Sequence, residues 1–118
     1  MAKPSKYSQI EPLQHILDLC ETIREEIGAR SLAEFEGDRN LADATAYRLQ
    51  AIGEASIKLG DEVKDQYDVP WTEIIGMRHI LSHDYLAISK RIVWTTATTN
   101  LDELEAACRA AIGGGRTK

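Results

Sequence analysis

Residues 41–59 read LADATAYRLQAIGEASIKL, a stretch without proline in which apolar residues recur at intervals of three and four. This spacing is the period of an α-helix, whereas a half-buried strand would alternate every second residue. Asn40 with Asp43 indicates a capping site at its start, and Gly60 follows it as a stop. The stretch therefore predicts one long helix, whose apolar stripe consists of Leu41, Ala44, Ala51, Ile52, Ala55 and Leu59.

Small side chains are frequent in the same stretch, at Ala44, Ala51, Gly53 and Ala55. A helix surface without bulky side chains lets a second helix approach closely. We therefore expect another helix of the chain to pack tightly along this one.

Helical spacing continues on both sides of this segment. The pair Ser8 and Glu11 resembles a capping box and predicts the start of a first helix, with Pro12 tolerated near its first turn. Ser89 is a good N-cap for the last helix. One helical turn is expected within residues 31–38, one or two turns within residues 61–68, and a further helix from about Trp71 to about Ser82. The outer helices have the stripes Tyr7, Ile10, Leu13, Leu17, Cys20, Ile23, Ile27 and Trp94, Ala97, Leu101, Leu104, Cys108, Ala111.

The organisation that follows is an all-α fold, an up-and-down antiparallel helical bundle. No internal repeat of 20–50 residues is present, so residues 1–112 are expected to form a single domain. Residues 113–118, GGGRTK, are expected to form a flexible tail. A bundle with so few long helices leaves apolar surface exposed on a monomer, which favours a dimer.

The composition is that of a globular protein, with 43% hydrophobic and 28% charged residues among 118. No apolar run reaches the ~18–20 residues of a membrane span, and the N-terminus lacks the apolar core of a signal peptide. A cytoplasmic protein without a membrane partner is expected. In that setting Cys20 and Cys108 are predicted to be reduced packing residues rather than a disulfide, and neither belongs to a zinc-type cysteine pair.

The net charge of −5 is distributed unevenly along the chain. Residues 1–75 hold eight Lys or Arg against fifteen Asp or Glu, a balance of −7, and residues 92–118 are neutral. Residues 76–91 hold three Lys or Arg against one Asp, a balance of +2. This pattern argues against indiscriminate binding to nucleic acid and favours contact with phosphates at one place.

That basic segment contains residues 78–85, RHILSHDY. Arg78 and His83 are five residues apart, which on a continuous helix separates them by about 140°. If the helix ends near Ser82, however, His83 lies on the exit turn and can turn back towards Arg78, with Tyr85 just beyond.

An arginine and a histidine are sufficient for metal-free cleavage of RNA. The guanidinium offers a fixed fork of donors to a phosphate, and the imidazole exchanges a proton near neutral pH. A base that removes the ribose 2′-hydroxyl proton lets this oxygen attack the adjacent phosphate. The leaving oxygen also needs an acid, which a second His83 across a dimer interface would supply.

Two other interpretations of the segment remain open at this point. An arginine and a histidine near a helix end are often surface residues or partners of the helix dipole. His79 and His83, four residues apart, can share a helix face and bind a metal. Asp84 is adjacent and Glu73 is a turn and a half away, so a third ligand is not evident, and neither a metal nor a cofactor is predicted.

Three blocks of the chain carry a resemblance to a known family: LAEFEGDRNLADATAYRLQAIGEA, VPWTEIIGMRHILSHDY and VWTTATTNLDELEAA, between residues 32 and 107. In order and spacing they resemble the HepT-like family of the HEPN superfamily. The family motif, an Arg, four residues, a His, one residue and a Tyr, falls on Arg78, His83 and Tyr85. His79 follows Arg78 where many relatives carry Asn.

The resemblance implies a toxin of a toxin–antitoxin pair, acting on tRNA or mRNA as a metal-independent endoribonuclease. It implies a homodimer, within a larger toxin–antitoxin assembly or alone, with Arg78 and His83 catalytic in a shared cleft, while His79 and Asp84 are candidate supporting residues. The implied partner is a minimal nucleotidyltransferase antitoxin, which would AMPylate Tyr85 and so place bulk and negative charge where RNA enters. The alternative is a non-catalytic helical module that docks or presents substrate to a nucleotidyltransferase.

Overall fold

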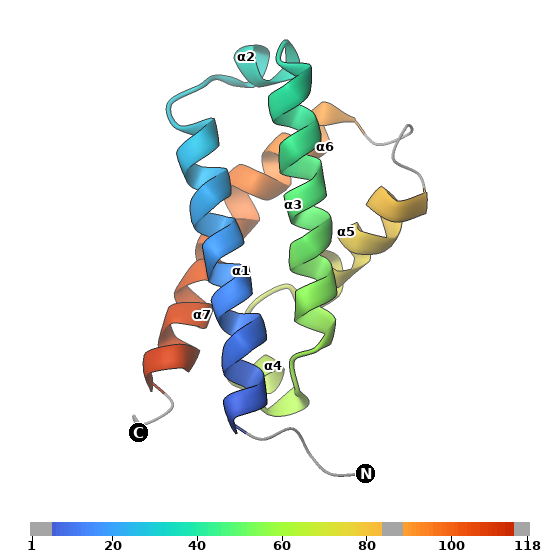
Figure 1. The fold of residues 1–118 in the computed structure, drawn as a ribbon. Coiled ribbons are helices and arrows are strands. Elements are labelled where there is room, and N and C mark those ends of the chain that lie inside the picture. The colour runs from blue at the N-terminus through green and yellow to red at the C-terminus, as the bar shows by residue number, and fades with distance from the viewer. Residues whose placement is uncertain (1–5, 84–88, 115–118) are drawn as a thin grey trace.

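The computed structural model describes the backbone of residues 6–83 and 89–114 and the side chains of residues 10–81 and 89–113. Within these ranges the chain is helical and contains no strand, which confirms the predicted all-α class (Figure 1). The elements are α1 (Lys6–Ile27), α2 (Leu32–Glu36), α3 (Arg39–Ile57), α4 (Asp61–Gln66), α5 (Trp71–His83), α6 (Lys90–Thr95), the π-helical η2 (Thr96–Asn100) and α7 (Leu101–Gly114).

The long helices form an antiparallel bundle, as the sequence predicted. Figure 1 shows α1 and α3 side by side in opposite directions, with α5 against α3 and α7 against α1. The packing of α3 on α5 is the most extensive contact between elements, followed by α1 on α3. Thus α3, the helix of residues 41–59, lies in the middle of the bundle. Among the described residues no helix is long and apolar enough to cross a membrane.

The start of α3 differs from the prediction. Asp38, not Asn40, is the N-cap, and its carboxylate accepts a hydrogen bond of 3.0 Å from the Leu41 backbone N–H. Asp38 has this role because α2 ends at Glu36 with Gly37 as its C-cap, so the first extended residue of the short connection is the one with an acidic side chain. The capping prediction was therefore wrong by two residues.

The first helix also begins earlier than predicted, at Lys6 rather than Ser8. Pro12 consequently lies inside α1 beyond its first turn, where it lacks the N–H that would reach the carbonyl of residue 8. The remainder of α1 packs as expected, because Leu13, Leu17 and Cys20 are buried on one stripe.

The buried face of α3 is only partly the predicted stripe. Ala44 and Ala51 are half-buried, whereas Leu49 and the polar Thr45 and Ser56 are buried instead. The difference arises because α3 is packed on two sides, against α1 and α5, so its buried surface is wider than one stripe. The hydroxyls of Thr45 and Ser56 each donate a hydrogen bond of 2.8 Å to the backbone carbonyl four residues earlier. Their burial therefore leaves no unpaired hydroxyl.

The last helix was predicted as one element and is divided by a π-helical turn. Ser89 caps α6 as predicted, since its hydroxyl accepts a hydrogen bond of 3.1 Å from the Ile92 N–H. The interruption is η2, where the Thr98 hydroxyl donates to the Trp94 carbonyl at 2.8 Å. At the other end α7 continues to Gly114, so the first residues of the expected tail are helical.

Both cysteines are free and buried, in agreement with the predicted packing role. Burial raises the pKa of the Cys20 thiol, and the nearby Cys108 and Glu105 raise it further. Burial also raises the pKa of Cys108 to about 12. Because the thiolate is the reactive form, neither residue is an activated nucleophile at neutral pH.

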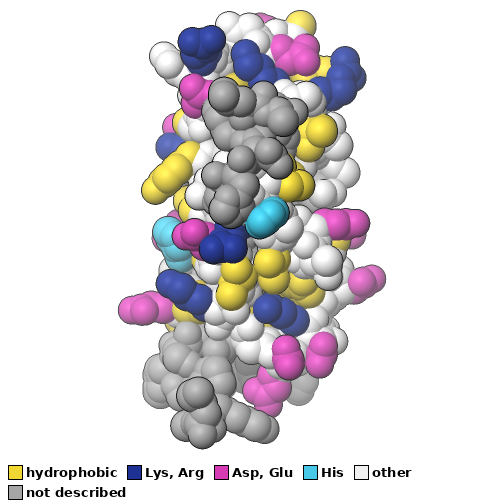
Figure 2. Space-filling model, turned by 90° about the vertical axis from the view of Figure 1, so that its right-hand side faces the viewer, with side chains coloured by type: hydrophobic (Ala, Val, Ile, Leu, Met, Phe, Trp, Pro, Cys, Tyr) yellow, Lys and Arg dark blue, Asp and Glu magenta, His cyan; other side chains and the backbone are white. Residues whose placement is uncertain are grey.

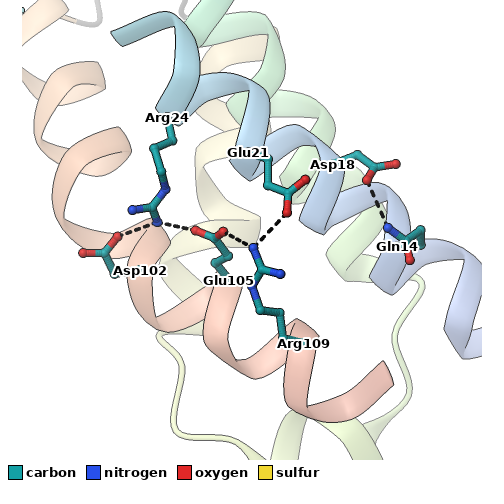
Figure 3. A network of polar contacts seen from close by, with 7 residues as sticks. All are labelled: Gln14, Asp18, Glu21, Arg24, Asp102, Glu105 and Arg109. Atoms are coloured by element: carbon teal, nitrogen blue, oxygen red, sulfur yellow. Dashed lines mark hydrogen bonds and ion pairs between the residues drawn. The ribbon is translucent and has the colours of Figure 1, made fainter. Parts of the chain in front are cut away.

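A network of charged side chains joins α1 to α7 (Figure 3). Glu105 is buried, with 7% exposure, and accepts hydrogen bonds from Arg24 and from Arg109, the latter at 2.8 Å. Each arginine also contacts an exposed carboxylate, Asp102 at 2.9 Å and Glu21 at 2.8 Å. Burial alone would raise the pKa of Glu105, but hydrogen bonds from Arg109 and Arg24 and their charges outweigh it, so the pKa lies below its ordinary value.

Replacement of this carboxylate is expected to destabilise the bundle. Glu105→Gln removes the charge that both arginines share, and we expect a loss of about 1–2 kcal/mol in the free energy of unfolding. Because the folded-state pKa of Glu105 is depressed, its contribution is complete above the ordinary value of 4.5 and disappears as the pH falls through the folded value. Urea denaturation at pH 7 and pH 4 measures both effects. A difference between wild type and variant that persists unchanged at low pH would contradict this role.

Candidate active site

Two of the three motif residues, Arg78 and His83, lie on α5, which ends close to the predicted position. The helix extends through His83, one residue beyond the expected end at Ser82. His83 is the last residue of α5, and the course of the chain after it lies outside the described residues. On this continuous helix the two positions are about 140° apart around the axis. The side chain of His83, and Asp84 and Tyr85 altogether, lie outside the described residues.

Arg78 is held by a close contact between α5 and α3. A β-carbon added to Gly53 would lie 2.7 Å from Cβ of Arg78, 3.0 Å from the Ile74 carbonyl oxygen and 3.3 Å from the Arg78 nitrogen. These atoms belong to the α5 backbone and the root of its side chain, so they cannot move aside by rotation about a side-chain bond. Gly53 is therefore required for the present separation of the two helices at Arg78, as the expected role of small residues in α3 implied.

The guanidinium of Arg78 faces the next residue of α3. Its Nε lies 3.5 Å from Oε2 of Glu54, and the two side chains are 42% and 54% exposed. Nε itself is inaccessible to solvent and has no hydrogen-bond partner among the described residues. The exposed area of Arg78 thus belongs to its other atoms, which include the two terminal nitrogens.

Exposed side chains of several kinds lie on α5 and α3, the two helices that meet at Arg78. His79 follows Arg78 on the exposed side of α5, and Ile80 beside it is 42% exposed. Tyr47 and Ile57 are exposed on α3, at 71% and 46%. On the molecular face in Figure 2, basic, acidic and histidine side chains lie beside hydrophobic ones. A surface of mixed polar and apolar character suits a macromolecular ligand better than a small apolar one.

The described residues do not support a metal centre. Among residues whose side chains the structure describes, no group of three or more His, Cys, Asp or Glu could hold a metal ion. Of the pair once considered for metal binding, His79 is described and the His83 side chain is not. The chemistry available from the described part of α5 is that of a partly exposed cation, Arg78.

Two residues of this site were not identified as functional from the sequence. The sequence pattern indicates Gly53 only as a small residue and indicates no role for Glu54. Both belong to the IGEA block of α3, so the signal was a glycine beside a charged residue inside a helix. Their relation to Arg78 depends on the pairing of α3 with α5, which no spacing within α3 reveals.

Comparisons with known proteins find one matching family model and several relatives. A family model described as "Ribonuclease HepT-like" matches residues 16–111. A protein of Caldanaerobacter subterraneus subsp. tengcongensis named "Putative RNase" is 39% identical over 94 residues, 79% of this chain and 84% of the relative. A "Probable ribonuclease HepT" of Thermococcus cleftensis is 28% identical over 104 residues, 87% of this chain and 92% of the relative. No solved structure shows significant similarity to the chain.

Proposed function

The chain belongs to the HepT-like family of the HEPN superfamily, and from this premise we propose that it is a metal-independent endoribonuclease, the toxin of a toxin–antitoxin pair. The observation that carries the proposal is the family match across residues 16–111, which includes both Arg78 and His83. Arg78 supports it, because its side chain is 42% exposed and a guanidinium offers a fixed fork of donors to a phosphate.

In the proposed reaction His83 acts as the base. It removes the proton of the ribose 2′-hydroxyl, and the oxygen forms a bond to the adjacent phosphorus while the bond to the 5′-oxygen breaks. Arg78 stabilises the negative charge on the phosphate oxygens in the transition state. The products are a 2′,3′-cyclic phosphate and a 5′-hydroxyl, whose proton comes from an acid. RNA is the only nucleic acid that carries the required internal nucleophile.

The proposed active form is a homodimer with one shared cleft. One chain supplies a single His83, whereas the reaction uses a base and an acid. The angular separation of Arg78 and His83 on α5 also supports a site completed by a second copy, because one helix alone directs the two positions apart. The exposed Ile80 lies on the same helix and is available for burial at such an interface.

Regulation is proposed to act on Tyr85. A minimal nucleotidyltransferase antitoxin would transfer AMP to its hydroxyl, which places a negatively charged group beside the position where the RNA phosphate enters. Tyr85→Phe is expected to retain cleavage and to escape this inhibition.

The proposal is tested by incubating purified protein, made without its partner, with mixed tRNA and mRNA in excess chelator. We expect cleavage that leaves cyclic phosphate ends, and its absence with His83→Ala separates the activity from contaminating nucleases. Intact mass recorded on the same sample shows whether AMP is present on the protein. No cleavage by protein of unmodified mass would overturn the proposal and favour a non-catalytic module that presents substrate to a nucleotidyltransferase.

A further inference from the structure

The acidic residue beside the candidate catalytic arginine is not explained by the stability of the bundle. Glu54 and Arg78 are both about half exposed, and an exposed ion pair contributes about 0–1 kcal/mol. Glu54 also places a negative charge next to a cation that is proposed to receive an RNA phosphate. A carboxylate at this position repels the phosphates of the RNA. We therefore expect it to have a role that compensates for this repulsion.

The atom of Arg78 that faces Glu54 indicates what the role of Glu54 is. A guanidinium has one donor on Nε and four on its terminal nitrogens, in a fixed plane. Nε is the inaccessible atom, it lies 3.5 Å from the Glu54 carboxylate, and it has no hydrogen-bond partner among the described residues. A movement of a few tenths of an ångström would form the hydrogen bond. Because the plane is rigid, that bond would fix the direction in which the terminal nitrogens point.

We propose that Glu54 is the positioning residue of Arg78: its carboxylate accepts a hydrogen bond from Nε and so directs the terminal nitrogens towards the scissile phosphate. This inference rests on the proposed ribonuclease function and adds a residue to its site. The long distance in the free protein is consistent with it, since hydrogen bonds of catalytic groups are often long without substrate and shorten in the complex. Gly53 makes the arrangement possible, because the close approach of α3 and α5 brings the root of the Arg78 side chain beside Glu54.

The decisive substitution is Glu54→Gln, which keeps the shape of the side chain and removes its charge. We expect kcat for RNA cleavage to fall roughly 10- to 100-fold, the range for a misplaced catalytic group. KM should stay constant or decrease, because a negative charge near the RNA has been removed. Glu25→Gln, an exposed acid on α1, is the matched control and should change neither constant.

A double-mutant cycle separates positioning from a general effect of charge. In Arg78→Lys the Nε donor is absent, so there is no planar fork for Glu54 to orient. Adding Glu54→Gln to Arg78→Lys should then lower kcat less than twofold. An equal loss in both backgrounds would show that Glu54 acts on something other than Arg78 and would overturn the inference.

A spectroscopic measurement keeps the inference testable independently of cleavage. The Nε–Hε resonance of Arg78 is followed by NMR with a bound DNA oligonucleotide, which lacks the 2′-hydroxyl and cannot react. Glu54→Gln should shift this resonance, and Glu25→Gln should leave it in place. If the wild-type protein fails to cleave RNA, the proposed function is wrong. In that case the Nε–Hε resonance still shows whether Glu54 forms a hydrogen bond with Arg78. Cleavage by Glu54→Gln at the wild-type rate or faster, or an unshifted resonance, would overturn the positioning role.

Discussion

His83→Ala is expected to lower the rate of RNA cleavage by about 10²- to 10⁴-fold, the usual contribution of a general acid or base. The loss is expected in kcat, because the imidazole acts on the reacting proton rather than on the body of the RNA. His83 is the last residue of α5. The measurement is single-turnover cleavage of a defined RNA in chelator, together with the unfolding curve of the variant.

The adjacent histidine provides a matched control. His79→Ala makes the same change on the same helix, four residues earlier, at an exposed position. If His79 contributes only to phosphate binding, its loss should raise KM and lower kcat less than tenfold. A pH–rate profile adds a second criterion, since a base must be deprotonated to act and the rate of the wild type should therefore fall at acidic pH. Wild-type cleavage by His83→Ala would refute the assigned role, and equal losses in both variants would leave the two histidines undistinguished as the base.

Gly53→Ala is expected to destabilise the protein and reduce its activity at the same time. The added methyl group would meet Cβ of Arg78 at 2.7 Å and the Ile74 carbonyl at 3.0 Å, so α3 and α5 must separate. Overpacking of this kind costs about 1–3 kcal/mol, which exceeds the gain of roughly 0.5–1 kcal/mol from replacing a helical glycine by alanine. Displacement of Arg78 should lower cleavage at least tenfold. Urea denaturation and a cleavage assay on the same preparation measure both effects.

Gly76→Ala is the matched control for this prediction. Gly76 lies within α5, and a β-carbon added there would meet nothing within 4 Å. The same substitution should therefore stabilise the fold by about 0.5–1 kcal/mol, because it removes only the flexibility of glycine in the unfolded chain. The two variants are expected to change stability in opposite directions. A gain in stability for Gly53→Ala would show that the contact between α3 and α5 is looser than described.

The helical periods in the sequence were sufficient for the class of fold and the approximate position of most helices. Stripes such as Leu13, Leu17 and Cys20 are buried as predicted, because a surface helix with one apolar face has few alternatives. Helix ends were less well predicted. Asp38 and Asn40 are both competent N-caps, and the choice between them depends on where the preceding turn of α2 ends. The π-helical turn at η2 had no recognised signal in the spacing.

For the candidate site, too, some features are predicted by the sequence and others are known only from the structure. The sequence alone determined which residues belong to the motif, Arg78, His83 and Tyr85, because the family pattern is a matter of order and spacing along one segment. It also identified Gly53 as a place where a second helix can approach. Each of these properties depends on the residues of a single segment of the chain.

Only the tertiary structure decided what holds the arginine. The sequence separates Glu54 from Arg78 by more than twenty residues, and helical spacing relates residues only within one helix. The packing of α3 against α5 brings Nε of Arg78 to 3.5 Å from Oε2 of Glu54. The same packing leaves no room for a side chain at position 53, so a glycine is required there. The continuity of α5 through His83 was likewise settled by structure. The physical reason is that contacts between helices depend on packing of the whole bundle, whereas the sequence pattern reports the preference of each helix separately.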